Sequence, residues 1–292
     1  MAVYYSAAKI NLFLRVEGRR PDGYHELTSV MQSVSLYDRL DIGFHRERFS
    51  LDTGGVDVGP AEKNTVTRMW RLLKDRFDLP GEIEVVIDKK IPVGAGLAGG
   101  SGNGAAVLRA AVDEFGLELT EEETASVCAA VGADVAFCYH GGTMLATGIG
   151  EKLKPLPPLF PCDILLFNAG FHVSTPEIFA AYDDIALGVE AVPVEMMLHA
   201  LERGSEEGVL CSLYNGLEAA AFPRYPSLRK LSDALDGLFL PHLMSGSGPT
   251  VFAFASEKAA RNLLKAAPRP ELGRIFPVRP VAEGILPGTG NE

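Results

Sequence analysis

The sequence lacks a basic excess, and this absence limits the partners that it can have. Its 292 residues include 27 Lys and Arg against 38 Asp and Glu, giving a formal net charge of −11. A broad nucleic-acid surface needs a basic patch or stripe, so we expect no nucleic-acid partner. An anionic small-molecule substrate is compatible with this charge if it binds in a locally basic pocket.

Cysteine is scarce, and its spacing argues against a zinc site. The four cysteines, Cys128, Cys138, Cys162 and Cys211, include no Cys-x-x-Cys pair. Because Cys128 and Cys138 have apolar neighbours, we expect buried, reduced thiols, which fit a reducing cytoplasm. We therefore predict no metal site built from the protein's own side chains.

Long apolar segments are also missing. The longest uncharged run begins at Ile91 and contains glycines, a proline and an asparagine, which excludes it as a membrane span. The N-terminus lacks a basic region followed by an apolar core, so we predict no signal peptide. With an apolar content of 47%, the chain reads as a globular, cytoplasmic protein without a membrane partner.

Strand and helix patterns alternate irregularly along the chain, which favours an α+β fold over a doubly wound sheet. Alternation over residues 10–16 predicts a strand with Lys9 and Asn11 side by side on one face. A helix is expected to start at Thr175 as the cap, with Pro176 in its first position. Further strands are predicted at 27–43, 83–87, 143–147, 163–167 and 244–256 (around a turn), with a final strand at 274–282, and helices at 63–77, 105–115 and 120–132.

A proline-rich stretch at 155–161 is the predicted domain boundary. It divides the chain into an N-terminal domain of residues 1–155 and a C-terminal domain of residues 156–292. A chain of this length is comfortable for two domains.

Residues 91–106 read IPVGAGLAGGSGNGAA, and six of these sixteen residues are glycine. A linker would be more polar, and a Walker A loop would need a lysine. The dinucleotide pattern Gly-x-Gly-x-x-Gly is present, but no acidic residue follows at the end of a second strand. What remains is a phosphate cradle, in which glycine amides and the N-terminus of the next helix surround an anion.

In this glycine-rich stretch the chain resembles the GHMP kinases, a superfamily of small-molecule kinases whose phosphate loop runs roughly PxxxGLGSSAA. More narrowly, it resembles the members that phosphorylate a cytidine diphosphate-linked methylerythritol. The motifs that carry this resemblance are AKINLFLRV (8–16), RRPDGYHEL (19–27), GADVAF (132–137), STPEIF (174–179), YNGLEAAAF (214–222) and SGSGPTVFAF (245–254).

The resemblance implies an α+β, two-domain GHMP kinase fold with the active site in the interdomain cleft. It implies transfer of the ATP γ-phosphate to the 2-hydroxyl of the methylerythritol unit, in non-mevalonate isoprenoid biosynthesis, with Mg²⁺ delivered on ATP. A monomer or a weak homodimer is expected. Two other interpretations stay open: another GHMP small-molecule kinase, or a catalytically impaired nucleotide-binding relative.

The resemblance also assigns roles to residues. It makes Asp134 the general base on the acceptor hydroxyl and Lys9 its catalytic partner. From the residues alone, Asp134 is either a helix cap or a functional carboxylate, and Lys9 is equally well a solvated strand residue. ATP binding is implied for Lys89, Pro92, Gly94, Gly96, Leu97, Gly99, Gly100, Ser101, Gly102 and Asn103, and substrate binding for Asn11, Tyr24, His25, Thr175 and Phe179.

The cytosine base is expected to be held by three of these residues. The resemblance places His25 at the base edge, with Tyr24 and Phe179 stacked on its two faces. The simpler alternatives are exposed turn residues for Tyr24 and His25, and a core aromatic for Phe179. Lys89 is either close to the nucleotide or solvated.

The glycine stretch departs from the family pattern GLGGGSSxAA. Ala98 replaces a glycine, Gly102 replaces the second serine and Gly104 replaces an alanine, while Ala136 replaces the proline of GADVPF. A missing serine hydroxyl at Gly102 predicts a lower rate, and Gly104 predicts a weaker helix start.

Overall fold

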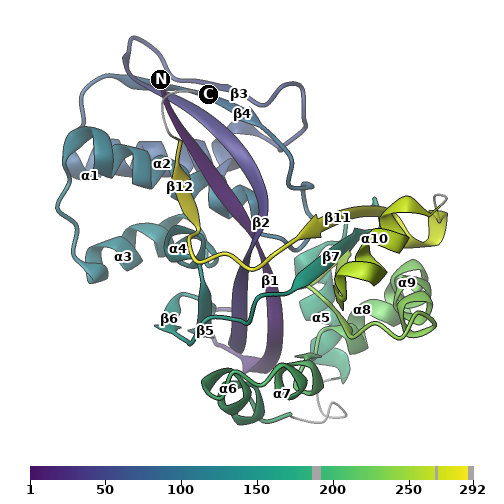
Figure 1. The fold of residues 1–292 in the computed structure, drawn as a ribbon. Helices are drawn as coiled ribbons and strands as arrows, with labels where there is room; N and C mark the ends of the chain where they lie inside the picture. The colour runs from purple at the N-terminus through teal and green to yellow at the C-terminus, as the bar shows by residue number, and fades with distance from the viewer. Residues whose placement is uncertain (186–191, 267–268, 289–292) are drawn as a thin grey trace.

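Two β-sheets, each covered by helices, make up the part of the chain that the computed structural model describes, residues 1–185, 192–266 and 269–288 (Figure 1). Within these residues the first sheet has eight strands and the second has four. The first contains β1 (Ala2–Arg19), β2 (His25–Arg46), β3 (Ser50–Asp52), β4 (Glu82–Asp88), β5 (Thr143–Gly148), β6 (Lys152–Pro155), β8 (Tyr214–Asn215) and β12 (Ile285–Pro287), and the second runs β11 (Arg274–Val278), β7 (Asp163–Asn168), β10 (Thr250–Ala255), β9 (His242–Met244).

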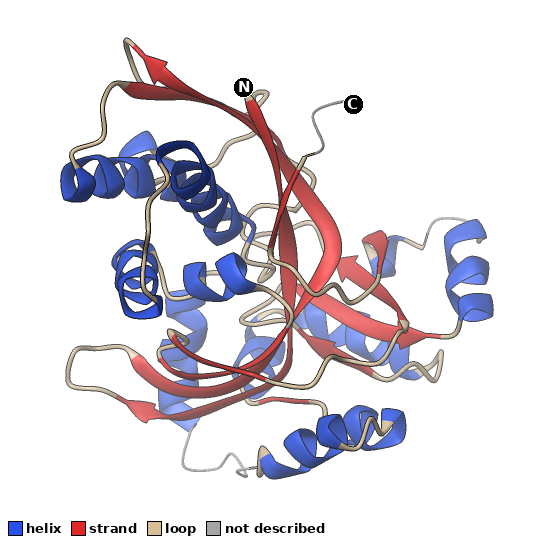
Figure 2. Cartoon of the chain, turned by 60° about the vertical axis from the view of Figure 1, so that its left-hand side comes forward, coloured by secondary structure: helices blue, strands red, loops and turns tan. Residues whose placement is uncertain are grey.

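Helices surround the sheets in two groups, seen as blue coils around the red strands in Figure 2. Four of them lie against the first sheet, and the others pack mainly around the second sheet and the lower end of β1. Together with the two sheets they confirm the α+β prediction. The helices are α1 (Thr65–Phe77), α2 (Gly99–Phe115), α3 (Glu121–Val131), α4 (Val135–His140), α5 (Thr175–Ile185), α6 (Glu195–Glu202), α7 (Glu206–Cys211), α8 (Glu218–Arg224), α9 (Pro226–Asp236) and α10 (Glu257–Lys265).

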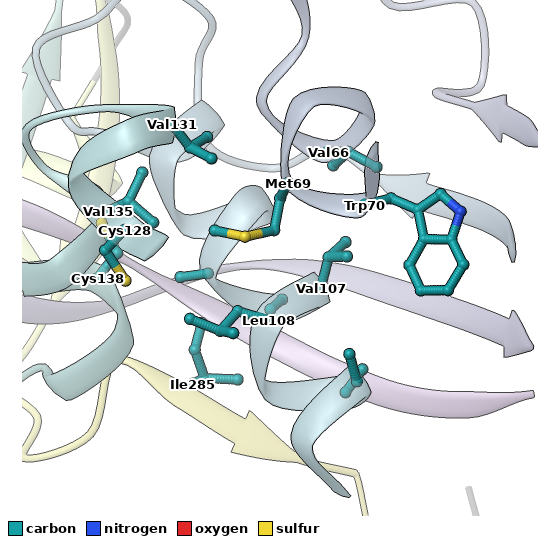
Figure 3. Packing of buried hydrophobic residues seen from close by; sticks show 14 of the residues in the cluster. Val66, Met69, Trp70, Val107, Leu108, Cys128, Val131, Val135, Cys138 and Ile285 are labelled. Atoms are coloured by element: carbon teal, nitrogen blue, oxygen red, sulfur yellow. The ribbon is translucent and has the colours of Figure 1, made fainter. Parts of the chain in front are cut away.

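The helices of the first group share one apolar core with the first sheet. Met69 and Trp70 of α1 belong to one buried cluster with Val107 of α2, and Ile285 of β12 joins this cluster from the far end of the chain (Figure 3). All four residues are almost completely inaccessible to solvent. The amphipathic pattern expected for α1 is therefore explained by burial against α2.

Strand β1 is buried on both faces because core clusters lie on either side of it. Its register against β2 shifts between Asn11 and Phe13, as at a β-bulge. Phe13 consequently packs in the same cluster as Leu12, whereas strict alternation would have placed them on opposite faces. Lys9 and Asn11, which precede the shift, do lie on the same face as predicted.

Helix α2 begins at Gly99, six positions before the predicted start at Ala105. Glycine has a low helix propensity, so the sequence favoured a loop here. Tertiary packing overrides that propensity, because a Cβ at Gly104 would come within 3.2 Å of Thr65 Cβ on α1. The glycines thus allow two helices to approach closely.

Three smaller expectations are corrected. Helix α5 begins at Thr175, and Ser174 accepts its first backbone hydrogen bond, so Thr175 is not the cap. Strand β12 follows the strand that was predicted to be the last. The four cysteines are free thiols, yet Cys211 is exposed on the short helix α7, whereas burial raises the pKa of Cys128 to about 12.

The predicted boundary falls between β6, which ends at Pro155, and β7 of the second sheet. The chain after this point is not confined to the second sheet, because β8 pairs with β1 and β12 pairs with β1 as well. The boundary therefore stays a prediction.

Candidate active site

A cavity of about 670 Å³ lies between the two sheets and the glycine-rich segment. Strands β1 and β2 form one wall, the end of the glycine segment forms another, and the start of α5 faces them. Its lining includes Lys9, Asn11, Tyr24, His25, Gly96, Ser101, Asp134, Thr175 and Phe179, all of them predicted site residues.

Lys9 and Asp134 form an ion pair at this cavity. Their Nζ and Oδ2 atoms are 3.8 Å apart, and the Asp134 side chain keeps 32% of its surface exposed. Asp134 stands at the N-cap position of α4, but its side chain makes no cap hydrogen bond. The carboxylate therefore faces the cavity and does not cap the N-terminus of α4.

Asn11 lies beside this pair and is fully buried. Its Oδ1 accepts a hydrogen bond of 2.7 Å from Lys9 Nζ. Its amide nitrogen donates to Ser29 Oγ at 2.9 Å, and Ser29 in turn donates to the carbonyl of Phe13. The polar face of β1 predicted from alternation is thus a connected hydrogen-bond chain.

The glycine-rich loop is shaped by left-handed backbone. Gly96 has φ 74°, and a Cβ there would come within 2.3 Å of the Ser245 carbonyl, so only glycine fits. Ala98, with φ 56°, adopts the same region without being glycine, and it is the residue before α2. The loop therefore turns sharply and directs the N-terminus of a 17-residue helix to the cavity.

Three residues of this segment, Gly96, Ala98 and Ser101, line the cavity. Leu97 is buried, and its carbonyl accepts a hydrogen bond from the backbone of Lys9 at 3.1 Å. The loop is thus hydrogen-bonded directly to β1, the strand that carries Lys9. Pro92, Gly94, Gly99 and Gly100 shape the loop or the first turn of α2 and are not among the cavity-lining residues.

Lys89 and Asn103 are directed to a buried carboxylate. Asp38 of β2 is inaccessible to solvent and forms an ion pair with Lys89, whose side chain is only 4% exposed. It also accepts hydrogen bonds from the backbone of Lys90 and Ile91 and from the Asn103 amide. The solvated alternative for Lys89 does not agree with this geometry.

Gly102 faces away from the cavity. A Cβ at this position would lie 3.2 Å from Ser6 Cβ and 3.3 Å from Ser6 Oγ on β1. A serine here would therefore place its side chain against a strand, and the expectation of a missing hydroxyl in the site does not hold in this structure.

His25, Phe179 and Asp183 form the opposite end of the cavity. The rings of His25 and Phe179 stack with centroids 4.7 Å apart, and His25 Nε2 lies 2.7 Å from Asp183 Oδ1. Tyr24 is 61% exposed at the rim. Phe179 is thus stacked on the His25 ring, while the Tyr24 side chain is exposed at the cavity rim.

A glycine turn between β9 and β10 completes the site. Ser245 Oγ donates to the Gly96 carbonyl at 2.9 Å, and Ser247 Oγ lies 2.7 Å from Thr175 Oγ1. The hydroxyl of Thr175 therefore binds this turn. Gly246 and Ser247 both line the cavity.

The turn is itself held by the segment around β8. The Asn215 amide donates to the carbonyls of Met244 and Gly246, and the carboxylate of Glu218 accepts a hydrogen bond of 2.8 Å from the Met244 amide. Burial raises the pKa of Glu218 to about 7. The motif YNGLEAAAF thus supports the site from behind.

Sequence reasoning missed Asp183, Ser29, Asp38 and Ser247. Asp183 and Asp38 each lie far along the sequence from the residue that they pair with. No local spacing pattern could therefore identify them as site residues. Ser29 had one weak signal, since it lies in the strand predicted at 27–43.

No metal-binding cluster of three or more His, Cys, Asp or Glu residues occurs in the described part of the chain. Ser101 and Asp134 line the cavity and carry oxygen donors of the kind that a hard cation prefers. A Mg²⁺ ion that arrives on nucleotide phosphates fits this sparse donor set, because such ions take few ligands from the protein.

Among the helices of the described residues, none is long and apolar enough to cross a membrane.

Comparison with known proteins places the chain in a family. Residues 64–142 match the GHMP kinases N terminal domain and residues 197–270 match the GHMP kinases C terminal domain. A 4-diphosphocytidyl-2-C-methyl-D-erythritol kinase from Bacillus pumilus is 38% identical over 278 residues, covering 94% of this chain and 96% of that protein. One from Moorella thermoacetica is 40% identical over 256 residues, covering 85% and 88%.

Solved structures agree with these relatives. The crystal structure of a 4-(cytidine 5'-diphospho)-2C-methyl-D-erythritol kinase superimposes with a TM-score of 0.78 at 33% identity, covering 95% of this chain and 98% of that one. A homoserine kinase from Cytophaga hutchinsonii, at 18% identity, superimposes with a TM-score of 0.69 over 98% and 96% of the chains, which shows the shared fold alone. The chain therefore belongs to the GHMP kinases and, within them, to the 4-diphosphocytidyl-2-C-methyl-D-erythritol kinase family.

Proposed function

We propose that the protein transfers the γ-phosphate of ATP to the 2-hydroxyl of 4-diphosphocytidyl-2-C-methyl-D-erythritol, a step of non-mevalonate isoprenoid biosynthesis. Membership of the family supports this reaction. The observation that carries it is the cavity between the two sheets, where the Lys9–Asp134 pair, the glycine-rich loop and the His25–Phe179 pair all face the same space.

The glycine-rich loop fits a chain of phosphates. Gly96 has no room for a side chain, so backbone comes close to the cavity, and the N-terminus of α2 supplies positive potential there. Ser101 adds a hydroxyl. Lys89 and Asn103 act on the shape of the loop through Asp38 rather than on the nucleotide directly. When bound, Mg²⁺ neutralises phosphate charge, and Ser101 and Asp134 are the residues that would hold it.

The acceptor end fits a cytidine diphosphate-linked sugar alcohol. His25 presents a ring that is anchored by Asp183 and stacked on Phe179, and Tyr24 has the exposure needed to cover a base. Base–aromatic stacking contributes about 1–3 kcal/mol per base. Thr175 and Asn11 line the same cavity.

In the proposed reaction the acceptor oxygen forms a bond to the γ-phosphorus as the bond to the β,γ-bridging oxygen breaks. ADP leaves, and the proton of the hydroxyl passes to Asp134. The ammonium of Lys9, 3.8 Å from that carboxylate, stabilises the charge that develops on the transferred group. Phosphoryl transfer depends mainly on such positioning and charge stabilisation.

We further propose a domain division near residue 155, a monomer or weak homodimer, and a cytoplasmic location, which suits four free thiols. The glycine turn at 245–248 belongs to the C-terminal domain, and its hydrogen bond to the Gly96 carbonyl would connect the two domains across the cleft.

The test is ADP formation with the cytidyl substrate, measured beside homoserine, mevalonate and galactose under the same conditions. We expect turnover with the cytidyl substrate alone. Turnover with one of the other acceptors only would reject the substrate assignment, and tight ligand binding without any turnover would favour a non-catalytic relative.

A further inference from the structure

The hydrogen-bond chain behind Lys9 has a direction that chemistry alone determines. An ammonium group can only donate, so the Asn11 atom that faces Lys9 Nζ at 2.7 Å must be the amide oxygen. The amide NH₂ of Asn11 must then face Ser29 Oγ, where it donates at 2.9 Å. The reversed amide would put two donors against each other at Lys9.

Ser29 terminates this chain and removes the remaining freedom. Its single hydroxyl proton is donated to the Phe13 carbonyl at 2.7 Å, which leaves its oxygen as an acceptor for Asn11. Both Asn11 and Ser29 have only 1% of their surface exposed, so water does not compete for these bonds. The register shift between Asn11 and Phe13 brings the Phe13 carbonyl within reach of the Ser29 side chain.

Resting on the function proposed above, we propose that Ser29 is a positioning residue for phosphoryl transfer. It fixes the orientation of the Asn11 amide, and through Asn11 it holds the Lys9 ammonium at the distance from Asp134 that the reaction uses. Without the Ser29 hydroxyl, the buried NH₂ group of Asn11 loses its acceptor, so the Asn11 side chain shifts and no longer holds the Lys9 ammonium in place. Displacement of a catalytic group by about 1 Å commonly lowers a rate by about 10².

Steady-state kinetics of three variants test this role. We expect Ser29→Ala to lower kcat by about 10- to 100-fold while the KM values for both substrates change by less than about twofold. Ser29→Thr, which keeps the hydroxyl, should retain kcat within a few-fold of the parent. The matched control is Ser212→Ala, because Ser212 is also buried and also donates to a backbone carbonyl at 2.7 Å, but it directly follows α7 and does not line the cavity.

Unchanged kcat in Ser29→Ala would overturn the proposal, as would equal losses in Ser29→Thr or in Ser212→Ala. A second measurement does not depend on turnover. Hydrogen exchange of the Asn11 side-chain amide, followed by NMR in the full-length protein, should accelerate in Ser29→Ala and not in Ser212→Ala. Accelerated exchange in a protein that lacks cytidyl kinase activity would support the hydrogen-bond chain while rejecting the proposed reaction, and unaltered exchange would reject the chain itself.

Discussion

Single carboxylates at and behind the cavity differ in how deeply they are buried and in which groups they contact. Asp134 is only partly buried, makes no helix cap and faces one cation, so its carboxylate stays available to a substrate. Glu218 is nearly enclosed, and its chief interaction is one backbone hydrogen bond. The carboxylate of Asp134 is thus open to the cavity, whereas that of Glu218 supports the turn that follows Met244.

At Asp134 we expect replacement by asparagine to lower kcat by about 10²–10⁴. The amide keeps the size of the side chain but can no longer accept the proton of the acceptor hydroxyl. ATP and acceptor affinities, measured by calorimetry, should change little. An Asp134→Asn enzyme with the parent's kcat would show that this carboxylate neither accepts the proton nor orients the hydroxyl.

Glu218 should make stability depend on pH. Burial raises its pKa from 4.5 to about 7, so the folded state holds a proton that the unfolded chain has lost. The free energy of unfolding therefore falls as pH rises from 4.5 to 7 and levels off above, by about 3 kcal/mol for this shift.

The comparison with Glu218→Gln isolates this effect, because glutamine does not titrate and can still accept from Met244. Denaturant unfolding of both proteins across this pH range should show the variant gaining in relative stability as pH rises. A stability difference that stays constant with pH would contradict the raised pKa.

At the scale of elements, helix α2 shows where sequence reasoning succeeded and where it stopped. The helix predicted at 120–132 is α3, which Thr120 and Glu123 start with a capping box. The start of α2 was wrong because Gly99–Gly104 have poor propensity, and only their contacts with Ser6 and Thr65 make the helix favourable. Such contacts join segments distant in sequence and leave no local pattern.

The packing of Gly102 reverses an expectation of the sequence. We expect Gly102→Ser to destabilise the protein by about 1–3 kcal/mol through overpacking against Ser6 and to leave kcat without any gain. Gly100→Ser is the matched control on the same helical turn, since its new Cβ would lie 3.8 Å from the nearest atom, Thr65 Oγ1. The thermal unfolding temperature and the kcat of both variants test this expectation. A higher kcat in Gly102→Ser would support the hypothesis that the site lacks a hydroxyl at this position.

At the scale of the whole molecule, the last strand of the chain joins the same β-sheet as the first strand. Strand β12 pairs with β1, and Ile285 enters the core that α1, α2 and α4 share. The positions of Lys9, Asn11 and Asp134 in one site were foreseen from motifs, but this closure was not, because three residues of strand carry too little periodicity to be recognised.

The closure predicts a large effect from a residue far from the cavity. Ile285→Ala should reduce the free energy of unfolding by about 2–5 kcal/mol, as expected for removing a buried isoleucine side chain. Urea unfolding measures this change, with Ile185→Ala as a control because Ile185 is 39% exposed. Equal losses in the two variants would show that β12 does not secure the N-terminal core.

Asp38 binds backbone amides at the start of the glycine-rich segment and the Asn103 side chain at its far end. One carboxylate therefore joins the two ends of the loop and holds its conformation without a bound nucleotide. Ordering the backbone of one residue costs about 1–2 kcal/mol in conformational entropy. In this protein the loop is ordered on folding, so nucleotide binding does not include this unfavourable term. Nucleotide association then needs no loop-folding step, so its observed rate should rise linearly with nucleotide concentration without reaching a plateau.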